Sequence, residues 1–187
     1  MAHHTVGNWE TAHLDNPTQW FLLSRAYLDG SLRLCQAMIA GDYPVTYQHG
    51  QVVMGLCRQA VELFFKGVIW KAIGTAPDSH SLLELEQTVR LVAPDVAEFF
   101  ACPFFAEEVK VECDPKTKEK LIALKAQSAK TLDQQLRYHV DRHGNPWPGV
   151  HGFRPDLFLA KLQYCSTQFE MVVYSLAEQG ETPKARS

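Results

Sequence analysis

The stretch from Gln51 to Leu85 constrains the fold most, because it joins a long apolar helical pattern to a sharp stop and a second helix start. Apolar residues recur in it at intervals of three and four, the spacing of one buried stripe on a helix. The stripe consists of Val53, Leu56, Cys57, Ala60, Leu63, Phe64, Gly67 and Val68. The pattern predicts a helix over about residues 47–73 that forms the central core element of its domain.

A second stripe of the same helix is charged. Arg58, Glu62 and Lys66 follow one another in steps of four, so side chains of opposite charge lie within reach of one another. A stripe of this kind is more often a solvated face than a ligand site. The sequence therefore favours a surface position for it.

The turn after this helix carries a single histidine. Gly74 and Pro77 stop the helix, and Ser81 with Glu84 forms a capping box that starts the next one. His80 thus stands at a helix N-terminus, where anions are favoured. Two interpretations are open: His80 meets an anion or phosphate, or its ring packs against the bundle and hydrogen-bonds a loop carbonyl. The sequence favours the second, structural interpretation.

The remaining patterns are also helical. We predict helices over 17–40, 81–91, 116–137 and 155–178, one or two short helical pieces over 94–111, and a long loop or small hairpin over 138–154. Asn16 is the expected N-cap of the first helix, with Pro17 in its first turn. The fold class is all-α: an up-and-down four-helix bundle with additional short helices. It forms a single domain over 17–178, between a polar arm (1–16) and a polar tail (179–187).

Composition limits the class of protein. The chain has 187 residues and a formal net charge of −3, so bulk nucleic-acid binding through a global basic excess is not indicated. Its five cysteines include no C-x-x-C pair, a usage that suits a reducing cytosol. No apolar run approaches the ~20 residues of a membrane helix. We expect a cytoplasmic protein without a membrane contact.

The predicted loop is rich in histidine, which raises the question of a metal. His139, His143 and His151 with Asp141 include ligands of the kind that zinc prefers. Gly144 and the following Asn-Pro step interrupt a helix through His143, so surface histidines are favoured and no metal is predicted. The chain has no glycine-rich phosphate loop and no G-x-S-x-G elbow, and we predict no cofactor.

Two groups of residues resemble motifs of the HEPN superfamily of small helical bundles. Arg58-Gln59-Ala60-Val61-Glu62 through Lys66-Gly67, then His80-Ser81-Leu82 and Leu85, is similar to the family's "A-x-E…K" helix and "H-[DS]-L-x-x-L" turn. Arg137-Tyr138 with Asp141 is similar to the "R-Y-P-D" element of members partnered with minimal nucleotidyltransferases, with His139 at the proline position. The resemblance implies an HEPN-like bundle and a homodimer.

The resemblance implies one of two functions. The first is a non-catalytic module that binds a nucleotide or partner, accessory to a nucleotidyltransferase in a toxin–antitoxin or stress and defence system. Lys66, His80, Arg137 and Tyr138 would then surround an anionic ligand. The second is a metal-independent endoribonuclease, in which Arg137 positions the RNA phosphate and His143 acts as acid or base. We favour the first.

A third hypothesis needs no small ligand. A structural bundle would dock another protein through an exposed apolar patch, around Phe99–Phe105 or Trp147.

Overall fold

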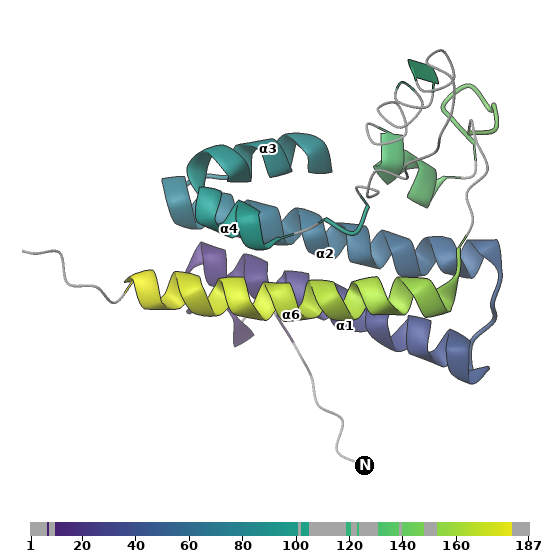
Figure 1. Ribbon diagram of the computed structural model, residues 1–187, viewed down its shortest axis with the longest axis horizontal. Helices are drawn as coiled ribbons and strands as arrows, with labels where there is room; N and C mark the ends of the chain where they lie inside the picture. Colours follow the sequence, from purple (N-terminus) through teal and green to yellow (C-terminus); the bar gives the residue numbers. More distant parts are fainter. Residues whose placement is uncertain are drawn as a thin grey trace, which may run out of the picture.

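Three long helices form the body of the protein in the computed structural model, which describes residues 7, 10–100, 102–104, 119–120, 123, 131–138, 140–147 and 153–180. They are α1 (Asn16–Ala40), α2 (Tyr47–Ile73) and α6 (Pro155–Gly180). Figure 1 shows α1 antiparallel to α2, and α6 running in the same direction as α2. All three predicted helices are confirmed, and the all-α class with them.

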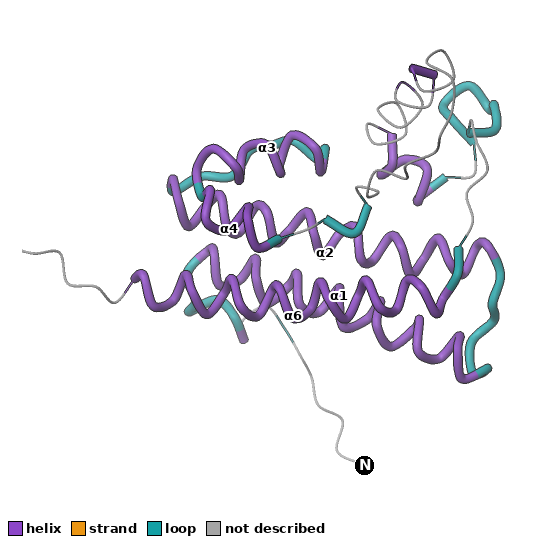
Figure 2. The backbone as a smooth tube through the Cα atoms, in the orientation of Figure 1, coloured by secondary structure: helices purple, strands orange, loops and turns teal. Residues whose placement is uncertain are grey.

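Two short helices follow α2. They are α3 (Leu82–Val92) and α4 (Pro94–Phe99), and α3 lies along α2 on the side away from α1 (Figure 1). Of the predicted helix over 116–137, residues 131–137 are described as a helix, together with positions 119–120 and 123; its other residues lie outside the described part. Figure 2 shows helices and loops, and no strand, in the part of the chain that the structure describes.

Local signals set the helix ends. The N-cap of α1 is Asp15, whose side chain accepts a hydrogen bond from the Thr18 amide at 2.9 Å; the prediction of Asn16 was wrong by one residue. Gly41 and Gly74 end α1 and α2 in the left-handed region, at φ 84° and 76°. Glycine adopts these angles without the steric penalty that a Cβ would bring.

α2 is the central element, as predicted, but it is buried more completely than one stripe requires. Every residue from 60 to 69 is buried, because α1 covers one side of α2 and α3 lies against another. Two buried serines of α1 hydrogen-bond to α2: Ser24 Oγ donates to the Ala60 carbonyl and Ser31 Oγ to the Val53 carbonyl, each at 2.8 Å. Polar groups in the α1–α2 contact are thereby satisfied.

The cysteines of the core are buried. Cys35, Cys57, Cys102 and Cys165 lie among apolar side chains, as expected for cysteines that act as small apolar residues. Burial raises the pKa of the Cys57 and Cys165 thiols, which keeps them protonated. Cys113 lies outside the described residues. Within the described part, none of the helices combines the length and the apolarity that crossing a membrane requires.

The close approach of α1 to α2 depends on Gly67. A Cβ built there would lie 2.7 Å from the Phe21 ring, whereas one built at Gly55 on the same helix meets nothing within 4 Å. We expect Gly67→Leu to lower the free energy of unfolding by about 1–3 kcal/mol through overpacking. Gly55→Leu is the matched control and is expected to stabilise by up to about 0.8 kcal/mol, because leucine favours a helix. Urea unfolding measures both variants. Equal changes in the free energy of unfolding for Gly67→Leu and Gly55→Leu would contradict the close approach of α1 to α2 at Gly67.

Candidate functional site

Four polar side chains meet around one carboxylate, and we name them the Glu62 cluster: Arg58, Glu62, Lys66 and His80. The Arg58 guanidinium donates from Nη1 to Glu62 Oε2 at 2.8 Å, and Lys66 Nζ lies 3.2 Å from Oε1. His80 Nδ1 lies 2.7 Å from the same Oε1. Arg58, Glu62 and Lys66 lie on successive turns of α2, and His80 lies in the turn that precedes α3.

The charged stripe of α2 is buried, which corrects the expected surface position. The side chains of Arg58, Glu62 and Lys66 are exposed by 8%, 3% and 7%, whereas that of His80 is 70% exposed. Charges out of contact with water need partners, and the steps of four supply them along one helix face. His80 is therefore the part of the cluster that solvent and ligands can reach.

Positive charge exceeds negative charge in the buried part of the cluster. Arg58 and Lys66 carry two cations against the single carboxylate of Glu62. The Lys66 ammonium also lies over the Trp20 ring, 5.8 Å from its centroid, a cation–π arrangement. The Arg58 guanidinium donates to the His80 carbonyl through Nη2, but its buried Nε has no partner among the described residues.

The exposed imidazole of His80 is held in one orientation. An ionised carboxylate only accepts hydrogen bonds, so the proton of this contact sits on Nδ1 and His80 donates to Glu62. Nε2 has no hydrogen-bond partner among the described residues. The ring thus fixes the turn, as the structural interpretation predicted, but through a carboxylate of α2 instead of a loop carbonyl.

The capping box is also present in a modified form. Ser81 is the N-cap of α3 and its side chain accepts from the Glu84 amide at 3.4 Å. The Glu84 carboxylate accepts from Ser79 Oγ at 2.6 Å, and Ser79 Oγ in turn accepts from the Ser81 amide at 3.1 Å. A serine therefore relays the contact that Glu84 makes directly in the standard box.

Opposing influences set the ionisation of Glu62. Burial is the largest of them and raises its pKa, but hydrogen bonds from His80 and Arg58 and the charges of Arg58 and Lys66 together outweigh it. The net result is a pKa below the ordinary value of 4.5. The carboxylate is therefore ionised at neutral pH.

Low pH should lower the free energy of unfolding by protonating the Glu62 carboxylate. A pKa lowered by folding stabilises the native state fully above the unfolded value of about 4.5, and the stabilisation is lost as the pH falls through the folded pKa. We expect the difference in free energy of unfolding between wild type and Glu62→Gln to be largest near about pH 7 and to narrow below about pH 4.5. Urea unfolding across this range measures it, and a constant difference would contradict the assignment.

Arg137 and Tyr138 lie apart from the Glu62 cluster. Arg137 is exposed, pairs with Asp133 at 2.6 Å and lies 6.0 Å from the centroid of the Tyr138 ring. Their segment contacts the beginning of α2, where Gln51 donates to the Gln135 carbonyl at 2.9 Å. Gln51 and Lys66 are separated by about 22 Å along the helix at 1.5 Å a residue. The structure thus brings Lys66 and His80 together, and places Arg137 and Tyr138 elsewhere.

His143 lies in a tight turn of the segment that was predicted as a long loop or small hairpin. Asp141 Oδ1 accepts from the amides of His143 and Asn145, each at 2.8 Å, and Val140 and Pro146 form an isolated bridge. No hydrogen bond or ion pair joins His143 to Arg137 within the described part of the chain, where His143 accepts from Arg142 instead. His139 and His151 lie outside that part, and no metal-binding group is found in it.

Reasoning from sequence missed the role of Glu62 as the centre of the site. A signal was available: the charges stand inside a stretch that is otherwise apolar, from Ala60 to Ile69. An ion pair in such a stretch indicates burial, since a solvated face would be polar at more positions.

Comparisons of the chain with protein-family models, with curated proteins and with solved structures found no match in any of the three. The likeness to HEPN proteins is thus carried by the sequence motifs alone.

Proposed function

We propose that the protein is a helical module that binds an anionic ligand, the phosphate end of a nucleotide, at the Glu62 cluster. The observation that carries this proposal is the surplus of buried positive charge: two cations share one carboxylate, and a buried Arg58 N–H has no partner among the described residues. An anion at the cluster would balance that charge. Low dielectric surroundings strengthen such an interaction.

Direct contact with the ligand falls to His80. Its imidazole is exposed, and with both ring nitrogens protonated Nδ1 donates to Glu62 while Nε2 donates to the anion. The N-terminus of α3 adds its positive dipole at the same place. Arg58 and Lys66 are buried, so they attract the anion mainly through their electrostatic field. Arg137 and Tyr138 have no part in this site.

The resemblance to HEPN proteins extends this proposal to partners. It predicts a homodimer, a cytoplasmic location and a nucleotidyltransferase partner within a toxin–antitoxin or defence system. These stay predictions from the motifs around Arg58 and His80 and, for the nucleotidyltransferase, from Arg137-Tyr138 with Asp141.

Calorimetric titration of the protein with ADP and with adenosine tests the proposal, since the two ligands share a nucleoside and differ in phosphate. We expect ADP to bind more tightly than adenosine, by about tenfold or more, as a charge-assisted hydrogen bond provides. His80→Ala should remove this preference. His143→Ala, a change at another exposed histidine, is the matched control and should retain it.

A second variant extends the titration. Glu84→Gln should strengthen the binding of ADP, because it removes a carboxylate from the first turn of α3. Equal binding of ADP and adenosine, or a preference unchanged by His80→Ala, would refute the proposed site.

A further inference from the structure

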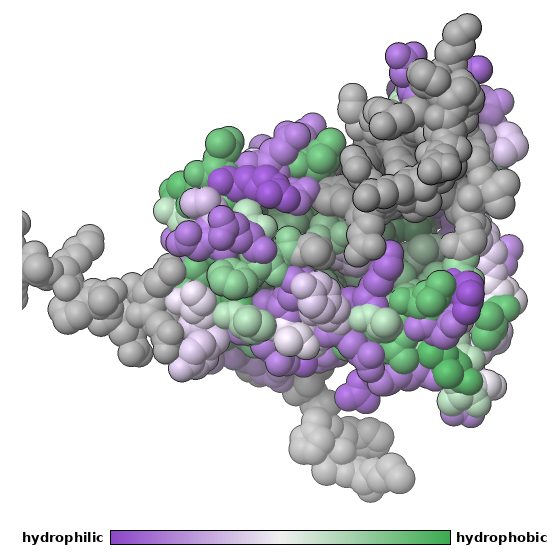
Figure 3. Space-filling view, viewed as in Figure 1, coloured by the Kyte–Doolittle hydropathy of each residue, from purple (hydrophilic) through white to green (hydrophobic). Residues whose placement is uncertain are grey.

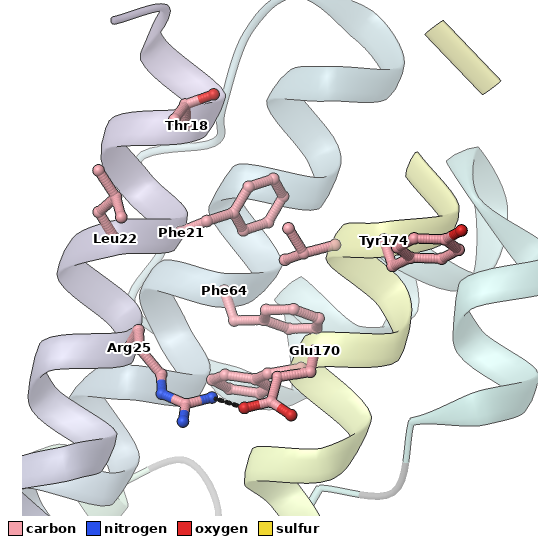
Figure 4. A pocket seen from close by; sticks show the side chains of 9 residues that line it. Thr18, Phe21, Leu22, Arg25, Phe64, Glu170 and Tyr174 are labelled. Atoms are coloured by element: carbon pink, nitrogen blue, oxygen red, sulfur yellow. Dashed lines mark hydrogen bonds and ion pairs between the residues drawn. The ribbon is translucent and has the colours of Figure 1, made fainter. Parts of the chain in front are cut away.

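A cavity that lies apart from the Glu62 cluster is found between α1 and α6. Its volume is about 490 Å³, within the range of small-molecule sites. Figure 4 shows Phe21 and Leu22 from α1 on one side, Tyr174 from α6 on the other, and Phe64 of α2 between them. The walls are mainly apolar, so the cavity favours an apolar body.

The floor of this cavity is rigid and aromatic. Phe64 and Phe169 stack with their ring centroids 3.9 Å apart and their planes 5° from parallel. Both rings are almost fully buried, at 1% and 4% exposure, so neighbouring core residues hold them in place. A floor of this kind is formed before any ligand arrives, which lowers the entropic cost of binding.

The cavity has the size of a small molecule. Its α1 wall runs from Thr18 to Arg25, which is about 10 Å at 1.5 Å a residue.

Negative charge prevails around the Arg25 end, where Arg25 and Glu170 line the cavity and Asp29 lies beside them, outside the lining. Arg25 donates from Nε to Asp29 at 3.0 Å and from Nη1 to Glu170, so two carboxylates share one guanidinium (Figure 4 shows the second contact). The side chains of Arg25, Asp29 and Glu170 are 40%, 45% and 63% exposed, so a ligand can reach them. The formal charge of this group is −1, and its complement is a cation.

We propose that this cavity binds a small organic cation, an ammonium group carried on an aromatic or aliphatic body. The body lies on the Phe64–Phe169 floor, and the ammonium lies at the exposed Glu170 carboxylate, with Asp29 adding to the negative field. The rings of Phe21 and Tyr174 line the same cavity, and an aromatic ring attracts a cation placed over its face. This site uses none of the residues that bind the anion at the Glu62 cluster.

A matched pair of probes tests the charge preference. 4-Phenylbutylamine and 4-phenylbutyrate carry the same aromatic body with opposite charge, and binding is followed by NMR shifts of amides in α1 and α6 at low salt, where exposed charges are least screened. We expect the amine to bind about fivefold more tightly than the acid, the size of effect that exposed charge pairs produce. The double variant Asp29→Asn with Glu170→Gln changes the formal charge from −1 to +1 and should reverse the preference.

Two control variants locate the binding. Val173→Trp fills the cavity and should abolish binding of the amine, whereas Met171→Trp, two positions away on α6 and outside the cavity, should not. Glu98→Gln on α4 removes an exposed charge elsewhere and should leave the preference for the amine unchanged. No binding of either probe, tighter binding of the acid to wild type, or binding that survives Val173→Trp would overturn the proposal.

Discussion

Glu62→Gln is expected to lower the free energy of unfolding by about 3–5 kcal/mol, the cost of removing one partner from a buried ion pair. Glutamine keeps the shape of the side chain but leaves Arg58 and Lys66 buried without a counter-charge. It also takes from His80 the carboxylate that holds its ring. Because small domains are stable by only about 5–15 kcal/mol, the loss is a large fraction of the total. Urea unfolding at neutral pH measures it.

A second pair of the same type is the control. Glu86 and Arg90 are also four residues apart, 2.7 Å from each other, but Arg90 is 58% exposed. Glu86→Gln should therefore lower the free energy of unfolding by less than about 1 kcal/mol. A similar loss from both variants would contradict the role assigned to burial.

The combined change Arg58→Met, Glu62→Leu, Lys66→Met separates stability from function. Replacing all the buried charges with apolar groups of similar size is often neutral or stabilising, by about 1–4 kcal/mol. We expect the triple variant to fold and to lose the preference for ADP. A folded triple variant that retains the preference would show that the charges serve the fold alone.

Phe100→Ala is expected to lower the free energy of unfolding by about 3–5 kcal/mol. The ring is 4% exposed and packs against three others, with centroids 5.2 Å from Phe64, 5.2 Å from Phe65 and 5.5 Å from Phe169. Its removal leaves a cavity in the aromatic centre of the bundle, which the rigid neighbours fill only in part.

The adjacent residue provides an unusually close control. Phe99 is 61% exposed, and its carbonyl, which accepts a hydrogen bond from Gln168, is untouched by a change of side chain. Phe99→Ala should change the free energy of unfolding by no more than about 0.5 kcal/mol. If the two alanine variants were equally stable, Phe100 would not be part of the core.

Along α6, exposed apolar residues do not form one patch on the face that Figure 3 draws. Looking onto α6, the figure shows polar and apolar residues interspersed, and Tyr164, Met171 and Tyr174 of α6 are each more than half exposed. Scattered apolar residues are ordinary on soluble proteins. The pattern therefore shows no docking patch along α6, and docking through Phe99–Phe105 or Trp147 stays a prediction.

The helix ends were predictable because their signals are local. Gly41 and Gly74 end helices through their own backbone angles, and Ser81 caps α3 through the amide three residues on. These interactions depend on neighbours in sequence, which a single sequence displays. The N-cap of α1 was misplaced by one residue, at Asn16 instead of Asp15, because Asp and Asn are both good N-caps and the sequence offers them side by side.

The site was less predictable because its contacts join distant segments. Whether the Arg58 stripe faces water depends on which elements cover α2, and this is a property of packing. Glu62 and His80 are 18 residues apart and meet only because the turn before α3 folds back on α2. The pairing of Arg25 with Glu170, over 145 residues, has no local signal at all.

The imidazole ¹⁵N signals of the wild-type protein test the central claim most directly. The chain has eight histidines, and His80 is assigned by the signal missing in His80→Gln. The Glu62 cluster predicts a proton on Nδ1 of His80 in the absence of ligand, and a saturable shift of its Nε2 signal on addition of ADP, larger than that of any other histidine. A His80 signal that shows the opposite tautomer, or that does not move while ADP binds, would contradict it.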